Sequence, residues 1–180
     1  MQFFGPDPDA IYEETLTVDI TGMNPQVACP HNPGNVKPVN EIGKIAVDQA
    51  FLGSCTNGRL EDIAIAAQIL KGHKVHTETR MLVAPASQEV MLEATKAGYT
   101  QILLESGAHI LPAGCGPCPG GHMGLLGAEE TCISSTNRNF PGRMGSEKSA
   151  VYLGSPATVA ASAISGKIAD PREFWNQTNI

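Results

Sequence analysis

Regular alternation of apolar runs and helical patterns between residues 45 and 166 is the feature that most limits how this chain can fold. The run "IAVDQAFLGS" (45–54) is apolar enough for a buried strand that ends at Gly53. Apolar residues then recur at helical spacing over residues 60–70, and Gly72 follows as a stop signal. Strands that alternate with helices in this way predict a parallel sheet covered by helices.

A second strand and helix follow in the same order. The segment "RMLVAP" (80–85) predicts a strand. Ser87 is suited to cap a helix that continues through Lys96, and Gly98 stands just past the expected end of that helix.

The pattern ends with two more strands and a well-delimited helix. The segments "TCISS" (131–135) and "AVYLGS" (150–155) predict short strands, and the final helix has Ser155 as cap, Pro156 at its first position and Gly166 as its stop. We therefore expect an α/β fold, a three-layer α/β/α domain whose mainly parallel sheet has helices on both faces.

Residues 1–44 differ from this pattern. They are irregular and contain six prolines, and only the alternating stretch from Leu16 to Ile20 favours an edge strand. We expect two parts: an irregular lead-in that wraps the domain (1–44) and the α/β domain itself (45–180).

Composition excludes several classes of protein. The chain is 42% hydrophobic and 17% charged, which is typical of a globular protein, and its net charge of −6 disfavours nucleic acid and anionic membranes as partners. No apolar run approaches the roughly 20 residues of a membrane span, and the amino terminus lacks the features of a signal peptide. Five cysteines without a secretory signal indicate a reduced, cytoplasmic setting rather than a disulfide framework.

Three cysteines lie in loops where such a sheet places its chemistry. Cys115 and Cys118 form a CxxC pair within "AGCGPCPGG" (113–121), and Cys55 lies in "FLGSCTNGR", just after the first expected strand. Ligands in open α/β sheets bind beyond the carboxyl ends of the strands, so these thiols can converge.

The segment after Cys55 opens a helix. Thr56 or Asn57 is expected to cap that helix, which leaves free backbone N–H groups near the thiolate. Such groups favour negative charge on sulfur.

The residues themselves leave three kinds of site open. A thioredoxin-like redox pair is disfavoured because that motif normally opens a helix, whereas Pro117 and Pro119 do not suit one. A zinc site needs a fourth ligand, for which the candidates are Cys29, Cys132, His31, His109 and His122. Cys29 and Cys132 are more easily explained as buried packing residues. Three cysteines without an obvious fourth suit an iron–sulfur cluster that leaves one iron open.

Three motifs in register now give a family resemblance. The segments "GSCTNGR" (53–59), "GCGPC" (114–118) and "STNRNFPGR" (135–143) resemble, in the expected order, three signatures of the aconitase superfamily. The resemblance covers residues 12–173 and is greatest to the large subunits of 3-isopropylmalate dehydratase and homoaconitase.

The resemblance implies a cofactor and its ligands. It assigns a 4Fe–4S cluster to Cys55, Cys115 and Cys118, with a fourth iron that has no protein ligand and acts on substrate as a Lewis acid. That open iron is labile, so the cluster is easily lost during purification.

The resemblance also assigns the third motif to the substrate. Asn137 is expected beside the cluster, while Arg138 and Arg143 are expected to reach substrate carboxylates. A planar guanidinium suits this task because it binds carboxylate with two parallel hydrogen bonds and stays charged.

Other parts of the family's site have no counterpart here, so no catalytic residue is assigned. The catalytic histidines of the family lie in preceding domains, and its serine base lies in a swivelling domain or small subunit. We therefore expect those domains as partners, and we expect no catalytic role for His109 or His122. Glu61 and Asp62 are expected to complement the dipole of the helix that they open.

Two classes of function follow. The first is a domain of a hydro-lyase that isomerises a 2-hydroxy di- or tricarboxylic acid by dehydration and rehydration. Isopropylmalate, a leucine-pathway substrate, is the first choice, homocitrate or homoisocitrate the second and citrate the third. The second class is an electron-transfer or binding module, which would have no use for carboxylate-binding arginines. The acidic balance disfavours RNA binding.

Overall fold

One seven-stranded sheet organises the computed structural model, which describes residues 5–175. Its strands are β1 (Gln26–Ala28), β2 (Val36–Pro38), β3 (Gln49–Gly53), β4 (Arg80–Ala84), β5 (His109–Ile110), β6 (Thr131–Ser134) and β7 (Ala150–Leu153). Their order across the sheet is β2-β1-β7-β6-β3-β4-β5. The five strands from β7 to β5 are parallel, whereas β1 is antiparallel to β7 and β2 is antiparallel to β1.

The described helices follow strands β3, β4 and β7. They are α1 (Ser54–Asn57), α2 (Leu60–Leu70), α3 (Gln88–Lys96), α4 (Tyr99–Ser106) and α5 (Pro156–Ser165), with 3-10 turns η1 (Val39–Glu41) and η2 (Pro171–Glu173). The hydroxyls of Ser87 and Ser155 accept the expected backbone N–H bonds, and Gly166 ends α5 at a φ of 71°. The helices predicted at α2, α3 and α5 are confirmed. Among residues 5–175, no helix is long and apolar enough to cross a bilayer.

Successive residues of the central strand β3 pack into two different cores. Ala50 and Leu52 belong to a cluster with the helices, whereas Phe51 belongs to a second cluster with Leu111 and Met144, which lie in loops. This is the period of two that a strand requires when both of its faces are buried.

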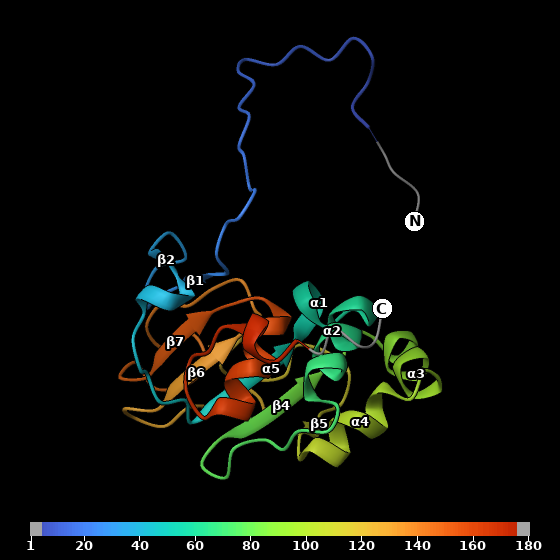
Figure 1. Cartoon of the computed structure of the whole chain (residues 1–180), viewed down its shortest axis with the longest axis vertical. Helices are drawn as coiled ribbons and strands as arrows, with labels where there is room; N and C mark the ends of the chain where they lie inside the picture. Colours follow the sequence, from blue (N-terminus) through green and yellow to red (C-terminus); the bar gives the residue numbers. More distant parts are fainter. Residues whose placement is uncertain (1–4, 176–180) are drawn as a thin grey trace.

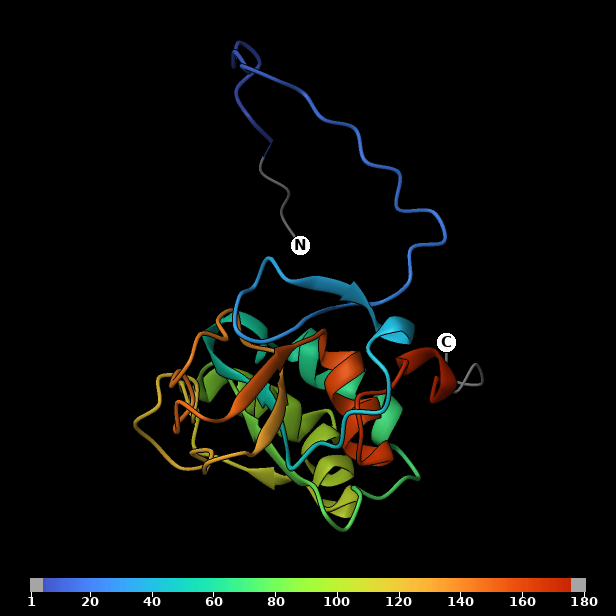
Figure 2. The same ribbon diagram turned by 90° about the vertical axis from the view of Figure 1, so that its left-hand side faces the viewer.

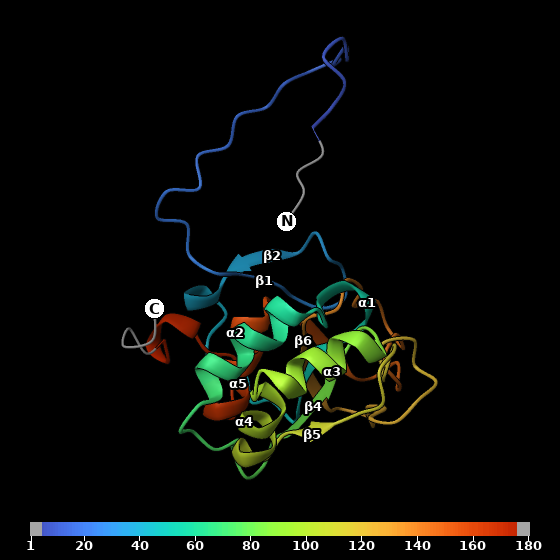
Figure 3. The ribbon, with the colours of Figure 1, turned by 90° about the vertical axis from the view of Figure 1, so that its right-hand side faces the viewer.

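Among residues 5–175, helices cover one of those faces and not the other. Helix α2 contacts α3, α4 and α5, so the four helices form a single layer (Figure 3). The opposite face is covered by the segments that follow β5 and β6, residues 111–130 and 135–149, which are loops (Figure 2). The α/β class and the mainly parallel sheet are confirmed, but loops form the layer on the second face, where we expected helices.

Strand order and the composition of the connections explain why loops cover the second face of the sheet. The chain moves outward from β3 through β4 to β5, then returns to the other side of β3 for β6 and continues to β7. Right-handed crossovers place the connections of the second half on the opposite face. Those connections are too rich in Gly and Pro to form helices, as "AGCGPCPGG" illustrates.

The same strand order creates a switch point between β3 and β6. The segments that follow these two strands leave toward opposite faces of the sheet, and open α/β sheets bind ligands at such a point, beyond the carboxyl ends of the strands. Cys55 follows β3 and the "STNRNFPGR" motif follows β6, so both lie at this switch point.

The predicted lead-in (1–44) contains two described parts with different structures. Residues 26–41 add β1, β2 and η1 to the edge of the domain, but residues 5–23 run away from it (Figure 1). The predicted edge strand from Leu16 to Ile20 is wrong, because this stretch has no paired strand and Leu16, Val18 and Ile20 are each at least 70% exposed.

Strands β1 and β2 are absent from the sequence prediction, and so are two elements that precede the CxxC loop. Helix α4 begins directly after Gly98 and ends before Gly107, and both glycines have left-handed φ values. It leads into β5, a strand of two residues that pairs with β4. These elements carry the chain to the CxxC loop at the carboxyl edge of the sheet.

Candidate functional site

Cys55 lies just beyond the end of β3, where the chain turns sharply into α1. Gly53 has a φ of 147°, and Ser54 has a φ of 67°, a left-handed value that serine seldom adopts. A Cβ on Gly53 would collide with the carbonyl oxygen of Ala84, so only glycine lets β3 end this close to β4. The turn leaves Cys55 exposed, and strained backbone of this kind is often found at functional sites.

Asn57 ties this turn to the loop after β6. Its side-chain amide donates to the carbonyl oxygen of Ser135 at 2.6 Å, and the Ser135 hydroxyl accepts a hydrogen bond from the Gly53 N–H at 2.9 Å. The expectation that Thr56 or Asn57 caps the next helix is wrong, since Asn57 is used for this link instead. Sequence reasoning did not single out Ser135, although it opens the third motif.

An acidic side chain accepts a backbone hydrogen bond at the start of helix α2. The Asp62 carboxylate accepts a hydrogen bond from the Arg59 N–H at 3.0 Å, and Glu61 stands in the same first turn. The expected roles of Glu61 and Asp62 at the start of the helix are confirmed. Partial burial raises the pKa of Asp62, and the Arg59 hydrogen bond opposes that rise.

The CxxC loop lies against the ends of β3 and β4. The Gly114 N–H donates to the Pro85 carbonyl at 2.8 Å, and Gly116, at a φ of 53°, packs so closely on Phe51 and Ala84 that a Cβ would lie about 3.1–3.3 Å from their side chains. Within this loop Cys115 is exposed and Cys118 is buried. The glycines therefore let the loop approach the sheet while one thiol points to solvent.

The two arginines of the loop after β6 differ in burial and in hydrogen bonding. Arg143 is half-buried, and its Nη2 donates to the Sγ of Cys118 at 3.5 Å. Asn137 and Arg138 are exposed, and within residues 5–175 neither side chain has a hydrogen-bond partner. Arg138 is thus free to bind an anion, whereas Arg143 is already engaged.

Two buried polar atoms in this loop lack partners among the described residues. They are Nε of Arg143 and Oδ1 of Asn139. The Asn139 amide nitrogen, by contrast, donates to the carbonyls of Cys29 and Val151 and so fixes the loop to β7 and to the residue after β1. An unpaired buried polar atom costs about 1–3 kcal/mol, which makes the Arg143 Nε a place where an arriving anion would be stabilised.

Three loops therefore meet at the carboxyl edge. The Cys55 turn is hydrogen-bonded to the loop after β6, the CxxC loop contacts the ends of β3 and β4, and Arg143 joins Cys118. Within residues 5–175, no three His, Cys, Asp or Glu side chains converge tightly enough to hold a single metal ion. The set of three cysteine ligands stays a prediction.

The donor chemistry at this edge fits an iron–sulfur cluster. Thiolates are the ligands such clusters use, and Gly114 and Gly116 have no Cβ to obstruct an approach to the sulfurs. Such a cluster is anionic, and the unpaired Nε of Arg143 beside Cys118 offers it a charged hydrogen-bond donor.

The remaining cysteines are packed. Cys29 is buried, and Cys132 is fully buried in β6 on the loop-covered face of the sheet. Burial raises the pKa of the Cys132 thiol to about 12, which makes it a poor ligand and a poor nucleophile.

The two histidines near the CxxC motif occupy different hollows. His122 lines a hollow of about 220 Å³ together with Cys115 and Pro119. His109 lies on β5 in an apolar depression with Leu111 and Met123. Only His122 shares a surface with a predicted ligand.

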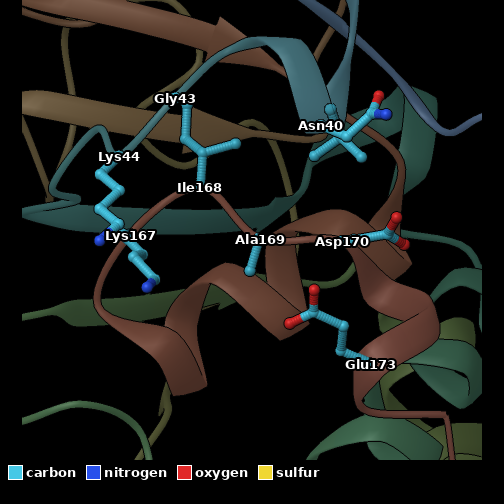
Figure 4. A pocket seen from close by; sticks show the side chains of 9 residues that line it. Asn40, Gly43, Lys44, Lys167, Ile168, Ala169, Asp170 and Glu173 are labelled. Carbon is cyan, nitrogen blue, oxygen red and sulfur yellow. The ribbon is translucent and has the colours of Figure 1, made fainter.

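A charged pocket of about 250 Å³ lies at the other edge of the sheet. Lys167 follows α5 and bridges to Ala46, which precedes β3, so this is the amino edge. Lys44 and Lys167 lie at one end of the pocket, and Asp170 and Glu173 at the other (Figure 4). Asp170 is already hydrogen-bonded to Arg172, which lowers its pKa, and the pocket shares no residue with the three loops.

Comparison with known proteins gives one consistent result. A family model described as the aconitase family (aconitate hydratase) matches residues 36–166. The chain is 56% identical over 169 residues to "3-isopropylmalate dehydratase large subunit 1" of Methanopyrus kandleri, covering 94% of this chain and 40% of that protein. It is 53% identical over 179 residues to the large subunit of the same name from Hydrogenobaculum sp., covering 99% of this chain and 42% of that protein. The chain thus spans about two fifths of the length of the curated relatives it matches.

Proposed function

The chain belongs to the aconitase family, and on that premise we propose that it is the iron–sulfur domain of a hydro-lyase of the 3-isopropylmalate dehydratase large-subunit type. The reaction is the isomerisation of a 2-hydroxy acid by dehydration and rehydration. Relatives named for this activity align with nearly the whole chain, which supports isopropylmalate as the first substrate to test.

Cys55, Cys115 and Cys118 would hold a 4Fe–4S cluster at the carboxyl edge. When bound, the cluster supplies a Lewis-acidic iron for the hydroxyl and a carboxylate of the substrate. The observation that carries this proposal is the meeting of three loops at the switch point, with Arg143 donating to Cys118 and Asn57 tied to Ser135.

Arg138 would bind a substrate carboxylate. Its exposed guanidinium has no partner among the described residues, so nothing need be displaced when a carboxylate accepts two of its N–H groups. Asn137, the preceding exposed residue, would donate or accept beside the cluster. Arg143 would keep substrate anions close through its remaining N–H groups.

The rest of the chemistry would come from partners. Dehydration needs a base for the proton on carbon and an acid for the departing hydroxyl, and neither is assigned to a residue here. The relatives are called large subunits, which supports a small subunit as one partner, and the further three fifths of their length supports additional domains as the other.

The test is an anaerobic comparison of two samples. One is the 180-residue chain reconstituted with iron and sulfide, and the other is an assembly with the remaining part of the Methanopyrus kandleri large subunit and its small subunit. We expect turnover of isopropylmalate only by the assembly, with homoaconitate and citrate as alternative substrates. Absence of a base and an acid costs about 10²–10⁴-fold for each role. Robust turnover by the chain alone would show that these groups are present, with His122 the first candidate.

A further inference from the structure

Two residues, Cys118 and Phe140, hold Arg143 in place. Its Nη2 donates to Cys118 Sγ at 3.5 Å, and its guanidinium carbon lies 5.5 Å from the centre of the Phe140 ring. Its backbone N–H donates to the Phe140 carbonyl at 3.1 Å, which closes the turn that precedes it. The side chain therefore has a defined direction toward the CxxC loop.

The two loops also touch through their backbones. A Cβ on Gly120 would lie 2.9 Å from the carbonyl oxygen of Arg143, so the glycine is what allows this approach. Cys118 and Gly120 lie two residues apart in the CxxC loop, and the contact keeps that short segment against Arg143. The Arg143–Cys118 contact is thus built into the packing of the loops.

Arg138 provides the contrast within the same motif. It stands five residues earlier, is exposed and has no hydrogen-bond partner among residues 5–175. A freely exposed guanidinium suits a ligand that comes and goes. A half-buried guanidinium fixed on a sulfur, with a second buried N–H at Nε still unpaired, suits a permanent anionic neighbour.

We propose that Arg143 is a positioning residue for the metal centre: it donates to the sulfur of Cys118 and stabilises the negative charge of that ligand and of the cluster it would hold. The inference rests on the proposed function, because it needs the cluster at this edge. It separates the two arginines, since Arg138 would act on substrate and Arg143 mainly on the cluster. Hydrogen bonds to ligand sulfur stabilise the reduced, more negatively charged state of a cluster and help to retain its metal.

The experiment compares variants of the reconstituted chain, measured anaerobically without substrate. For Arg143→Gln we expect roughly 10–100-fold weaker retention of iron against a chelator, the usual effect of removing a partner of a metal ligand, and a lower reduction potential. Arg143→Lys keeps the positive charge and should restore part of both. The matched control is Arg138→Gln, which removes the same charge from the same loop and should leave iron retention and potential unchanged.

Phe140→Leu is a gentler second variant, because it removes the ring beside the guanidinium but keeps the arginine. It should weaken iron retention in the same direction and by less, even if Arg143→Gln fails to fold. Equal iron retention and potential in wild type, Arg143→Gln and Phe140→Leu would overturn the inference and leave the proposed function standing. Equal losses in Arg143→Gln and Arg138→Gln would also overturn it, because a general charge effect would then suffice. Wild-type protein that takes up no iron and sulfide would overturn both proposals.

Discussion

The two edges of the sheet differ in how their polar groups are satisfied. At the amino edge, Arg80 of β4 donates to both carboxylate oxygens of Glu130 at 2.8 and 2.9 Å, and Glu130 also accepts the Gly127 N–H. Asp48, just before β3, accepts the N–H of Thr131 at 2.7 Å. These groups have partners within the domain.

The carboxyl edge is built in the opposite way. It has two exposed thiols, an exposed Arg138, a buried unpaired Nε on Arg143 and a serine at a left-handed φ. Groups of this kind do not stabilise the fold, so stability alone does not explain why they lie together at one edge. The difference between these two sets of groups supports the proposal that the ligand binds at the carboxyl edge, while the Arg80–Glu130 and Asp48–Thr131 contacts stabilise the sheet at the amino edge.

The largest expected effect comes from removing the carboxyl-edge thiols. Cys55→Ser, Cys115→Ser or Cys118→Ser should abolish the brown colour and bound iron of anaerobically reconstituted protein, because serine is a poor ligand for these clusters. Cys29→Ser and Cys132→Ser are the matched controls and should retain both. Loss of iron on changing Cys29 or Cys132, with Cys55 dispensable, would show that the ligand set is wrong.

The next effect concerns the close approach of β3 and β4. A Cβ on Gly53 would collide with backbone atoms of Ala84, so Gly53→Ala should lower the free energy of unfolding by about 3 kcal/mol in urea titrations. Gly121→Ala is the control, because nothing lies within 4 Å of a Cβ there, and it should change stability by less than about 0.5 kcal/mol. Similar losses for both variants would remove the steric explanation.

Thiol reactivity should also differ between the buried Cys132 and the exposed cysteines of the carboxyl edge. Cys132 is fully buried, and burial raises the pKa of its thiol to about 12, so an alkylating reagent should leave it unmodified in the folded apo protein. The exposed Cys55 and Cys115 should be modified first, as peptide mass spectrometry would reveal. Early modification of Cys132 would mean that the sheet opens more readily than its packing indicates.

The smallest effect lies in the amino-edge ion pair. The hydrogen bond from Arg80 is the main cause that lowers the pKa of Glu130 below its usual 4.5. The pair therefore stabilises the fold above about pH 4.5, and this contribution is lost as the pH falls through the lowered value. Because both side chains are partly exposed, Glu130→Gln should cost less than about 1 kcal/mol at pH 7. The difference from wild type in urea titrations should shrink by pH 3, and a constant difference would exclude the ion pair as its cause.

Features set by short-range chemistry could be predicted from sequence. The Ser87 and Ser155 caps, the Gly166 stop and the apolar stripe of α2 depend on residues a few positions apart, and all are present. The placement of the cysteine loops at one edge also follows from the parallel direction of the strands, which the alternation of elements predicts.

Features set by distant partners could not be predicted. The two residues of β5 form a strand because β4 lies beside them, and the alternating Leu16–Ile20 stretch lacks a strand beside it. Asn57 looks like a helix cap in sequence, but Ser135, 78 residues away, takes its hydrogen bond. The contact between Arg143 and Cys118 likewise joins residues 25 positions apart.

The most direct test of the carboxyl-edge account is a Mössbauer spectrum of the chain reconstituted anaerobically with ⁵⁷Fe and sulfide. Three cysteine ligands predict a four-iron cluster in which one iron site differs from the other three, and that site should respond when a hydroxy acid is added. A single-iron centre, or four equivalent irons that ignore the hydroxy acid, would contradict the assignment of Cys55, Cys115 and Cys118 as a three-ligand set.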